Sequence, residues 1–123
     1  MSSEMQEVND TPASKLGLAF ARAIVSGEFS VAHAMLSNAL RQELRPQDLE
    51  SRYNTMIEYG DGPPDHIEVI QVDNMDGWKS KQKGDVGWAY VAICGDGYNE
   101  AVSVIVAEEE ARDCIRLIEW GRP

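Results

Sequence analysis

The sequence predicts a single α+β domain in which helices come first and a mostly antiparallel sheet of about four strands follows. Its 123 residues, 43% of them hydrophobic, are enough for one core and too few for two domains. Apolar residues recur at helical spacing in the first half of the chain, whereas β-branched and aromatic residues fill strand-length segments in the second half. We therefore expect one domain over residues 12–123, preceded by a flexible polar tail over residues 1–11.

Three helices are predicted from capping residues and proline positions. Thr11 is a suitable N-cap with Pro12 at the first helical position, and Gly27 ends the helix that follows. Ser30 can cap a second helix, which should stop just before Pro46 because the residue preceding a proline is pushed out of the α region. Pro46 then opens a third helix, which the segment G-D-G-P-P ends.

Four strands are expected over residues 66–73, 86–94, 98–107 and 112–120. The segment G-D-G between the second and third strands is a strong hairpin signal, since Gly and Asp tolerate the positive φ of tight turns. If all three of these residues form the loop, Trp88 pairs with Val104, and Tyr90 pairs with Val102.

This register makes both faces of the sheet largely apolar. One face carries Trp88, Tyr90, Val102, Val104, Ile115 and Leu117. The opposite face carries Ala89, Val91, Ile93, Ala101, Ser103, Ile105, Cys114, Arg116, Ile118 and Trp120. The helices can cover one face, and the other must meet solvent, line a pocket or meet a second copy of the protein.

The charge of the chain excludes several partners. The 11 basic and 21 acidic residues give a formal net charge of −10, which repels nucleic acids and anionic membrane surfaces. No Lys or Arg occurs between Asn54 and Trp78 or between Gly84 and Ala111, and each of these windows holds six acids. Such a surface either stays solvated or meets a basic protein partner.

No targeting, metal or disulfide pattern stands out in the sequence. The N-terminus lacks a basic segment followed by an apolar one, and no apolar run is long enough to span a membrane. Cys94 and Cys114 lie in strand-like segments and are expected to be free buried thiols. These features favour a cytoplasmic protein, and we expect no cofactor and no bound metal.

The order of elements and several short segments resemble the nuclear transport factor 2-like superfamily, over roughly residues 13–120. The segments are G-E-F at 27–29 followed by A-H-A-M-L-S, then L-R-P-Q-D-L, V-G-W-A-Y-V-A-I and the terminal I-R-L-I-E-W-G. This superfamily includes ketosteroid isomerase, polyketide cyclases and many small bacterial domains of unassigned role. The resemblance implies three helices packed in the concave face of a strongly curved, cystatin-like sheet that forms a cone, often with an apolar pocket and often dimeric through sheet faces.

The acid-base groups of the enzymatic members have no clear counterpart here, so no catalytic residue is assigned. Asp65 and His66 form a weak acid-base candidate pair at the start of a strand, and His33 is expected on a helix face. The expected pocket is lined by Tyr53, Met56, Trp88, Tyr90, Val102 and Val104.

Arg116 interrupts the apolar final strand and must find an acceptor, because burying an unpaired charge costs several kcal/mol. Three interpretations remain open. Arg116 can pair with an acid such as Glu100 or Glu119, contact an anionic group of a ligand, or anchor an interface together with Trp120 and Tyr98.

These observations favour a non-catalytic binding or scaffolding domain, dimeric through sheet faces and able to hold a small apolar ligand. One alternative is an immunity-type inhibitor that masks a basic toxin, since some immunity proteins resemble this fold and the net charge suits a cationic partner. Another is a small-molecule isomerase or dehydratase in which Asp65 and His66, or Tyr53 and Tyr90, act on an apolar ligand.

Overall fold

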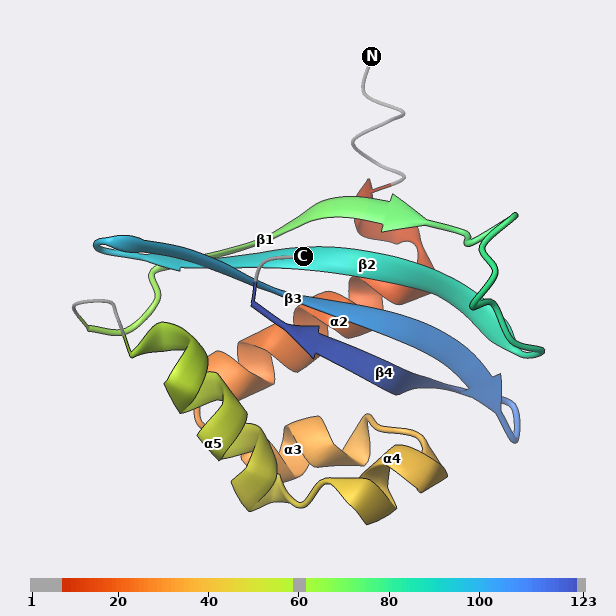
Figure 1. Cartoon of the computed structure of the whole chain (residues 1–123), viewed down its shortest axis with the longest axis horizontal. Helices are drawn as coiled ribbons and strands as arrows, with labels where there is room; N and C mark the ends of the chain where they lie inside the picture. The colour runs from red at the N-terminus through yellow and green to blue at the C-terminus, as the bar shows by residue number, and fades with distance from the viewer. Residues whose placement is uncertain (1–7, 59–61, 122–123) are drawn as a thin grey trace.

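The protein is an α+β domain in which helices pack on one face of a four-stranded antiparallel sheet (Figure 1). The computed structural model describes residues 8–58 and 62–121. The named elements are α2 (Pro12–Val25), α3 (Phe29–Ala34), α4 (Asn38–Glu43), α5 (Pro46–Ile57), β1 (His66–Asp73), β2 (Asp85–Gly95), β3 (Tyr98–Glu109) and β4 (Arg112–Trp120).

The expected starts of the first and third helices are confirmed. Thr11 caps α2 in a reciprocal pair with Ser14, in which the backbone N–H of each residue donates to the other's hydroxyl at 3.0 Å. Arg45 precedes α5, and its backbone N–H donates to the Asp48 carboxylate at 2.8 Å. Pro12 and Pro46 occupy the first helical position of α2 and α5, where a missing N–H costs nothing.

The expected second helix is instead two short helices, α3 and α4, and Ser30 does not cap either of them. Between them the chain runs beside β4: Ser37 N–H donates to Ile115 O at 2.7 Å, and Ile115 N–H donates to Met35 O at 2.9 Å. The Ser37 hydroxyl then caps α4 by accepting from Leu40 N–H. This pairing with the sheet edge interrupts the helix between α3 and α4. The apolar periodicity of the segment does not indicate the interruption.

The strands follow one another in the sheet in the order β1-β2-β3-β4, all antiparallel. The bounds of β1 and β4 are those expected, and β2 and β3 are slightly longer than expected.

The predicted register between β2 and β3 is wrong by one residue. Gly95 stays in the strand and pairs with Tyr98, so Asp96 and Gly97 alone make the turn, with Gly97 at φ 83°. Trp88 therefore pairs with Ile105 instead of Val104, and Tyr90 pairs with Ser103 instead of Val102. Because side chains alternate along a strand, this shift changes which residues share a face.

We call the helix-covered side the inner face and the opposite side the outer face. The inner face consists of Ile67, Val69, Val72, Ala89, Val91, Ile93, Val102, Val104, Val106, Ile115, Ile118 and Trp120. The outer face includes Trp88, Tyr90, Ala92, Cys94, Ala101, Ser103, Ile105, Ala107, Cys114, Arg116, Leu117 and Glu119. A register shift in β4 places both Arg116 and Leu117 on the outer face.

The inner face and the helices form a well-packed core. Phe20, Leu36 and Leu49 are fully buried against it. Residues 8–10, which fall in the expected tail, are helical, and Val8 packs against the core. Residues 1–7, the remainder of the expected tail, lie outside the described residues. The expected start of the domain at residue 12 stays a prediction.

Gly17 sets the distance between α2 and the sheet. A Cβ at this position would lie 3.3 Å from both Ala89 Cβ and Val104 Cγ2. We expect Gly17→Val to lower the free energy of unfolding by about 2–3 kcal/mol, because overpacking forces the helix off the sheet. Chemical denaturation measures this change. Lys15→Val, at an exposed position of the same helix, is the control, and equal effects of the two changes would contradict the close-approach role of Gly17.

Candidate functional site

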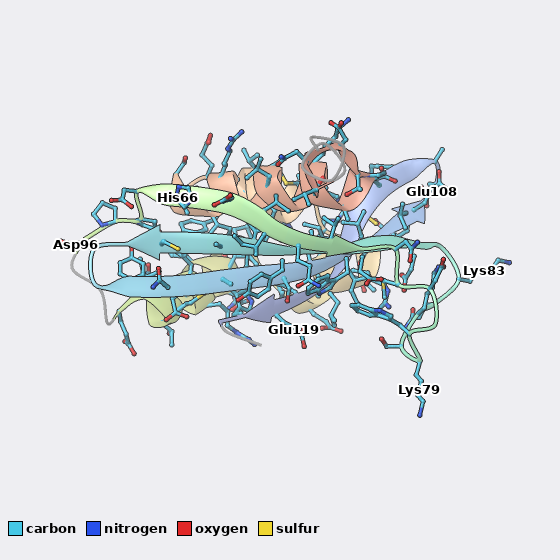
Figure 2. All side chains as sticks on the ribbon, turned by 90° about the horizontal axis from the view of Figure 1, so that it is seen from above. His66, Lys79, Lys83, Asp96, Glu108 and Glu119 are labelled. Carbon is cyan, nitrogen blue, oxygen red and sulfur yellow. The ribbon has the colours of Figure 1, made fainter. Side chains whose placement is uncertain are left out.

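The outer face of the sheet is the candidate functional surface, because none of the described helices covers it (Figure 1). Figure 2 looks onto this face from above. Leu117 on β4 is 40% exposed, and Ile70 at the bulge of β1 is 49% exposed. Trp88 and Tyr90 in the middle of the face are partly exposed. Large apolar side chains left open on a sheet face are typical of surfaces that meet a partner.

Three aromatic rings form a continuous row on this face. The ring centroids of Trp78 and Trp88 are 5.6 Å apart with planes 56° apart, and those of Trp88 and Tyr90 are 6.1 Å apart with planes 27° apart. Trp78 belongs to the connection between β1 and β2, so its contact with Trp88 holds the connection against the outer face.

A buried ion pair fixes the same connection from its other side. Arg116 Nε donates to Asp85 Oδ1 at 2.6 Å, and Arg116 Nη2 donates to Asp85 Oδ2 at 2.7 Å. The Asp85 side chain is only 1% exposed, and the Arg116 side chain is 18% exposed. Arg116 also donates to Ser80 O at 3.2 Å, while Asp85 accepts from Gln82 N–H at 2.8 Å. The pair therefore ties the connection to β4 through both partners.

The structure agrees with the first of the three interpretations of Arg116, because its guanidinium forms a bidentate pair with an acid. The acid is Asp85, not the expected Glu100 or Glu119. The hydrogen bonds from Arg116 lower the pKa of Asp85 against the opposing effect of burial, and the same pairing raises the pKa of Arg116. The charge of Arg116 is thus compensated within the chain.

A surface hollow of about 540 Å³ lies between the connection and the sheet. Trp78, Trp88, Ile105 and Leu117 form its apolar walls, and Arg116 and Lys81 lie at its polar side. The Lys81 ammonium pairs with Asp76 at 3.1 Å, so both of these cations already have acidic partners.

The residues expected to line one pocket lie on two sides of the sheet. Val102 and Val104 are buried on the inner face, with Tyr53 and Met56 of α5 in the same core. Trp88 and Tyr90 lie on the outer face. The one-residue register shift separates them, so the six residues do not share a cavity.

A shallower hollow does reach the α5 side of this core. It measures about 350 Å³ and is lined by Arg52, Thr55, Met56, Glu100, Trp120 and Gly121. Tyr53 itself is 7% exposed, its ring lies 6.4 Å from that of Phe29, and burial raises its pKa.

The residues proposed to anchor an interface with Arg116 are also separated. Trp120 is on the inner face, with its ring 6.1 Å from that of Phe20. Tyr98 is 7% exposed, its hydroxyl donates to Gly62 O at 3.1 Å, and burial raises its pKa. Tyr98 therefore closes the end of the sheet, and neither aromatic joins Arg116 on the outer face.

The expected acid-base pair does not form. His66 Nε2 lies 2.8 Å from Glu68 Oε1, and both side chains are more than half exposed. Asp65 instead joins the sheet through its backbone N–H, which donates to Cys94 O. His33 contacts the carbonyl oxygen of Arg41 and so links α3 to α4.

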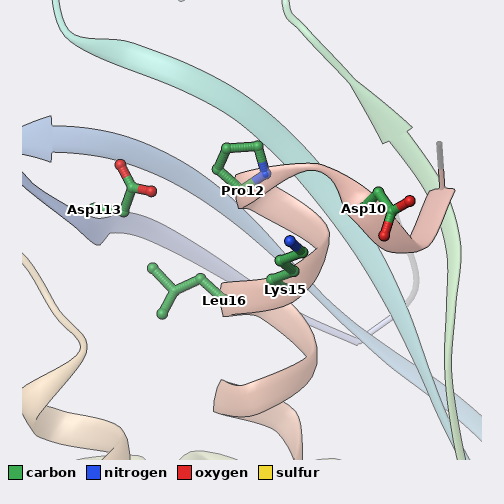
Figure 3. Close-up of a pocket in the computed structure, with 5 residues that line it drawn as sticks. All are labelled: Asp10, Pro12, Lys15, Leu16 and Asp113. Carbon is green, nitrogen blue, oxygen red and sulfur yellow. The ribbon is translucent and has the colours of Figure 1, made fainter. Parts of the chain in front are cut away.

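A further surface hollow, of about 400 Å³, lies where the start of α2 approaches β4 and is lined by Asp10, Pro12, Lys15, Leu16 and Asp113 (Figure 3). Residues 8–58 and 62–121 contain no group of three or more His, Cys, Asp or Glu side chains arranged to hold a metal ion. Cys114 is a buried free thiol, with its pKa raised by burial, and Cys94 is free and half-buried. No helix among these residues has the length and apolar character needed to cross a bilayer.

Comparison of the chain with protein-family models, with curated proteins and with solved structures gives no significant match. The geometry of the outer face therefore carries the functional argument.

The buried ion pair of Asp85 and Arg116 should make a pH-dependent contribution to the free energy of unfolding. We expect Asp85→Asn to lower the free energy of unfolding by about 3 kcal/mol at neutral pH, since it leaves Arg116 without its counter-charge. Because the pKa of Asp85 is below 3.8 in the folded protein, the pair contributes fully above that pH and its contribution is lost as the pH falls through the folded-state pKa.

The measurement is chemical denaturation of the wild type and the variant at neutral pH and in a series of acidic buffers. Asp113→Asn, at an exposed position, is the control. A stability difference that stays constant down to about pH 2 would show that ionisation of Asp85 is not its source.

Proposed function

We propose that this protein is a non-catalytic binding or scaffolding domain of the nuclear transport factor 2-like fold that self-associates through the outer face of its sheet. The carrying observation is the aromatic row Trp78, Trp88 and Tyr90 on a face that the described helices leave uncovered. The order of helices followed by a four-stranded antiparallel sheet supports the fold assignment, with the cone-like curvature of that fold as part of the proposal.

Self-association suits the chemistry of this face. Its large apolar side chains Trp88, Tyr90 and Leu117 are at least partly exposed, and the charge of Arg116 on β4 is already compensated by Asp85. Aromatic residues are enriched at the centres of interfaces because they bury a large area at a small cost in side-chain entropy. A sheet face of this kind gains more from a matching apolar face than from solvent.

The positions of the candidate acid-base groups count against an enzyme. Tyr53 is in the core, Tyr90 is on the outer face, and His66 is exposed beside Glu68. General acid-base catalysis needs such groups within hydrogen-bond reach of one reacting atom, and these three occupy separate environments. The isomerase or dehydratase alternative therefore has the weakest support.

An immunity-type inhibitor of a basic toxin is the second candidate function. It is favoured by the net charge of −10 and by two exposed acids at the β3–β4 hairpin end, Glu108 at the end of β3 and Glu110 in the turn. Acidic surfaces accelerate association with cationic proteins, an effect that weakens as salt is added. Pull-down with the purified protein at low and high salt distinguishes this role, which requires a basic partner that is lost at high salt.

Arginine substitutions on the outer face should dissociate the dimer without unfolding the chain. We expect Ile70→Arg together with Leu117→Arg to raise the dimer dissociation constant at least about tenfold, because two charges would be desolvated at the interface. Both residues are exposed in the single chain, so its fold should not change. Sedimentation velocity measures association, and circular dichroism checks folding.

Val31→Arg is the matched control, because Val31 is 50% exposed on α3, away from the sheet face. A wild-type protein that sediments as a monomer at all concentrations would overturn the proposal. A dimer that Val31→Arg dissociates and the outer-face pair does not would move the interface to the helical side.

A further inference from the structure

We infer that the connection between β1 and β2 is a strap that opens and closes over the outer face, so that its position determines how much apolar area this face offers. The strap is defined as residues 76–83, between Met75 and Gly84. The inference goes beyond the proposed function, because opening of the strap occurs within one chain and is measured there, whatever binds the outer face.

Both ends of the strap are anchored. The Met75 side chain is fully buried, and its backbone N–H donates to Asp73 Oδ1 at 2.6 Å. At the other end, Gly84 O accepts from Glu108 N–H at 2.9 Å, and the side chain of Asp85 is only 1% exposed. Any local opening of the connection is therefore confined to the residues between these anchors.

The strap itself makes little contact with the sheet. Trp78 is the one strap residue that is not exposed. Its ring centroid lies 5.6 Å from that of Trp88, and nearby Ser80 O accepts from Arg116 Nη2 at 3.2 Å. Segments with few buried contacts open at a free-energy cost well below that of global unfolding. The Trp78 ring is therefore the main closing contact of the strap.

Other hydrogen bonds of the strap are local. Trp78 N–H donates to Met75 O at 3.0 Å, and Lys81 N–H donates to Trp78 O at 3.2 Å. Gln82 N–H donates to Asp85 Oδ2 at 2.8 Å. Each of these bonds joins residues three positions apart in the chain. A strap that moves away from the sheet about its two anchors can keep them, so opening does not require the strap to unfold.

Packing beneath the strap is incomplete. The hollow of about 540 Å³ separates the strap from the sheet, and its floor includes Trp88, Ile105 and Leu117. Ile105 is only 4% exposed, although none of the described helices covers the outer face. Its cover comes from its cross-strand partners Trp88 and Leu117 and from the strap. Opening would join Ile105 and Trp88 to the apolar surface that Leu117 already exposes.

Opening leaves no buried charge without a partner. The two bonds between Arg116 and Asp85 do not involve the strap, so the ion pair stays formed when the bond to Ser80 O is lost. Lys79 and Lys83 are exposed, and Figure 2 shows their side chains directed away from the sheet. The cost of opening is thus chiefly the loss of the Trp78 contact, since the strap's charged groups are already solvated.

The first test measures access to the floor with the strap intact. Ile105→Cys is introduced into a chain in which Cys94→Ala and Cys114→Ala remove the native thiols, and iodoacetamide labels the introduced thiol at low protein concentration. We expect labelling faster than global unfolding allows, at a rate that low concentrations of urea leave nearly unchanged, because local opening exposes little surface. A labelling rate that follows global unfolding at every urea concentration would overturn the inference.

The second test measures the position of the strap. Spin labels are attached at Lys79→Cys on the strap and Glu119→Cys on β4, in the same background without native thiols, and the labelled chain is diluted with unlabelled chain. Pulsed electron paramagnetic resonance then gives the distances within one chain. We expect Trp78→Ala to raise the ratio of long to short distances at least about tenfold, because the closing contact is lost.

Lys83→Ala is the matched control, because Lys83 is an exposed strap residue directed away from the sheet, and it should leave the distances unchanged. Circular dichroism checks that each variant folds. Equal distance distributions in the wild type and in Trp78→Ala would contradict a strap that Trp78 holds closed. Neither result depends on self-association: a wild-type monomer would remove the proposed function alone, and a fixed strap would remove this inference alone.

Discussion

The packing of the Tyr98 ring over Gly95 is the constraint on which the arrangement of the sheet depends. A Cβ on Gly95 would lie 2.5 Å from that ring, so only glycine fits there, and the two residues pair across the hairpin. The turn is therefore two residues long. This length determines that Val102 and Val104 enter the core while Trp88 and Tyr90 face outward. A loop longer by one residue would pair Trp88 with Val104 and Tyr90 with Val102 and so place all four side chains on the same face.

The fold class could be predicted from the sequence, because capping residues and strand-length apolar segments are local signals. Two helix starts are predicted correctly, one from Thr11 with Pro12 and one from Pro46. The bounds of β1 and β4 follow from the residue composition of these segments. The break between α3 and α4 could not be predicted in this way, since it depends on hydrogen bonds to Ile115, some eighty residues later in the chain. Local propensity carries no information about such a long-range pairing.

The candidate site was predictable only in its composition. The sequence indicates that one sheet face lacks cover and that Arg116 needs an acceptor. The sequence does not indicate that the acceptor is Asp85. Asp85 lies at the start of β2, and only the register of the strands brings it beside Arg116 on β4. Gly95 was interpreted as a turn residue, whereas its role is to make room for Tyr98. Both errors concern contacts across strands, which depend on a register that a single sequence leaves open by one residue.

The segment beside Ile115 has a consequence for strand addition at the edge of the sheet. Backbone groups of Met35 and Ser37 occupy part of the outward edge of β4, which would otherwise be free to recruit another strand. The opposite edge, β1, is distorted by a bulge at Ile70 and carries the charged Glu68. Neither edge offers a flat, regular template, so growth by strand addition into filaments is discouraged. The proposed association through the outer face would then stop at a closed pair of chains.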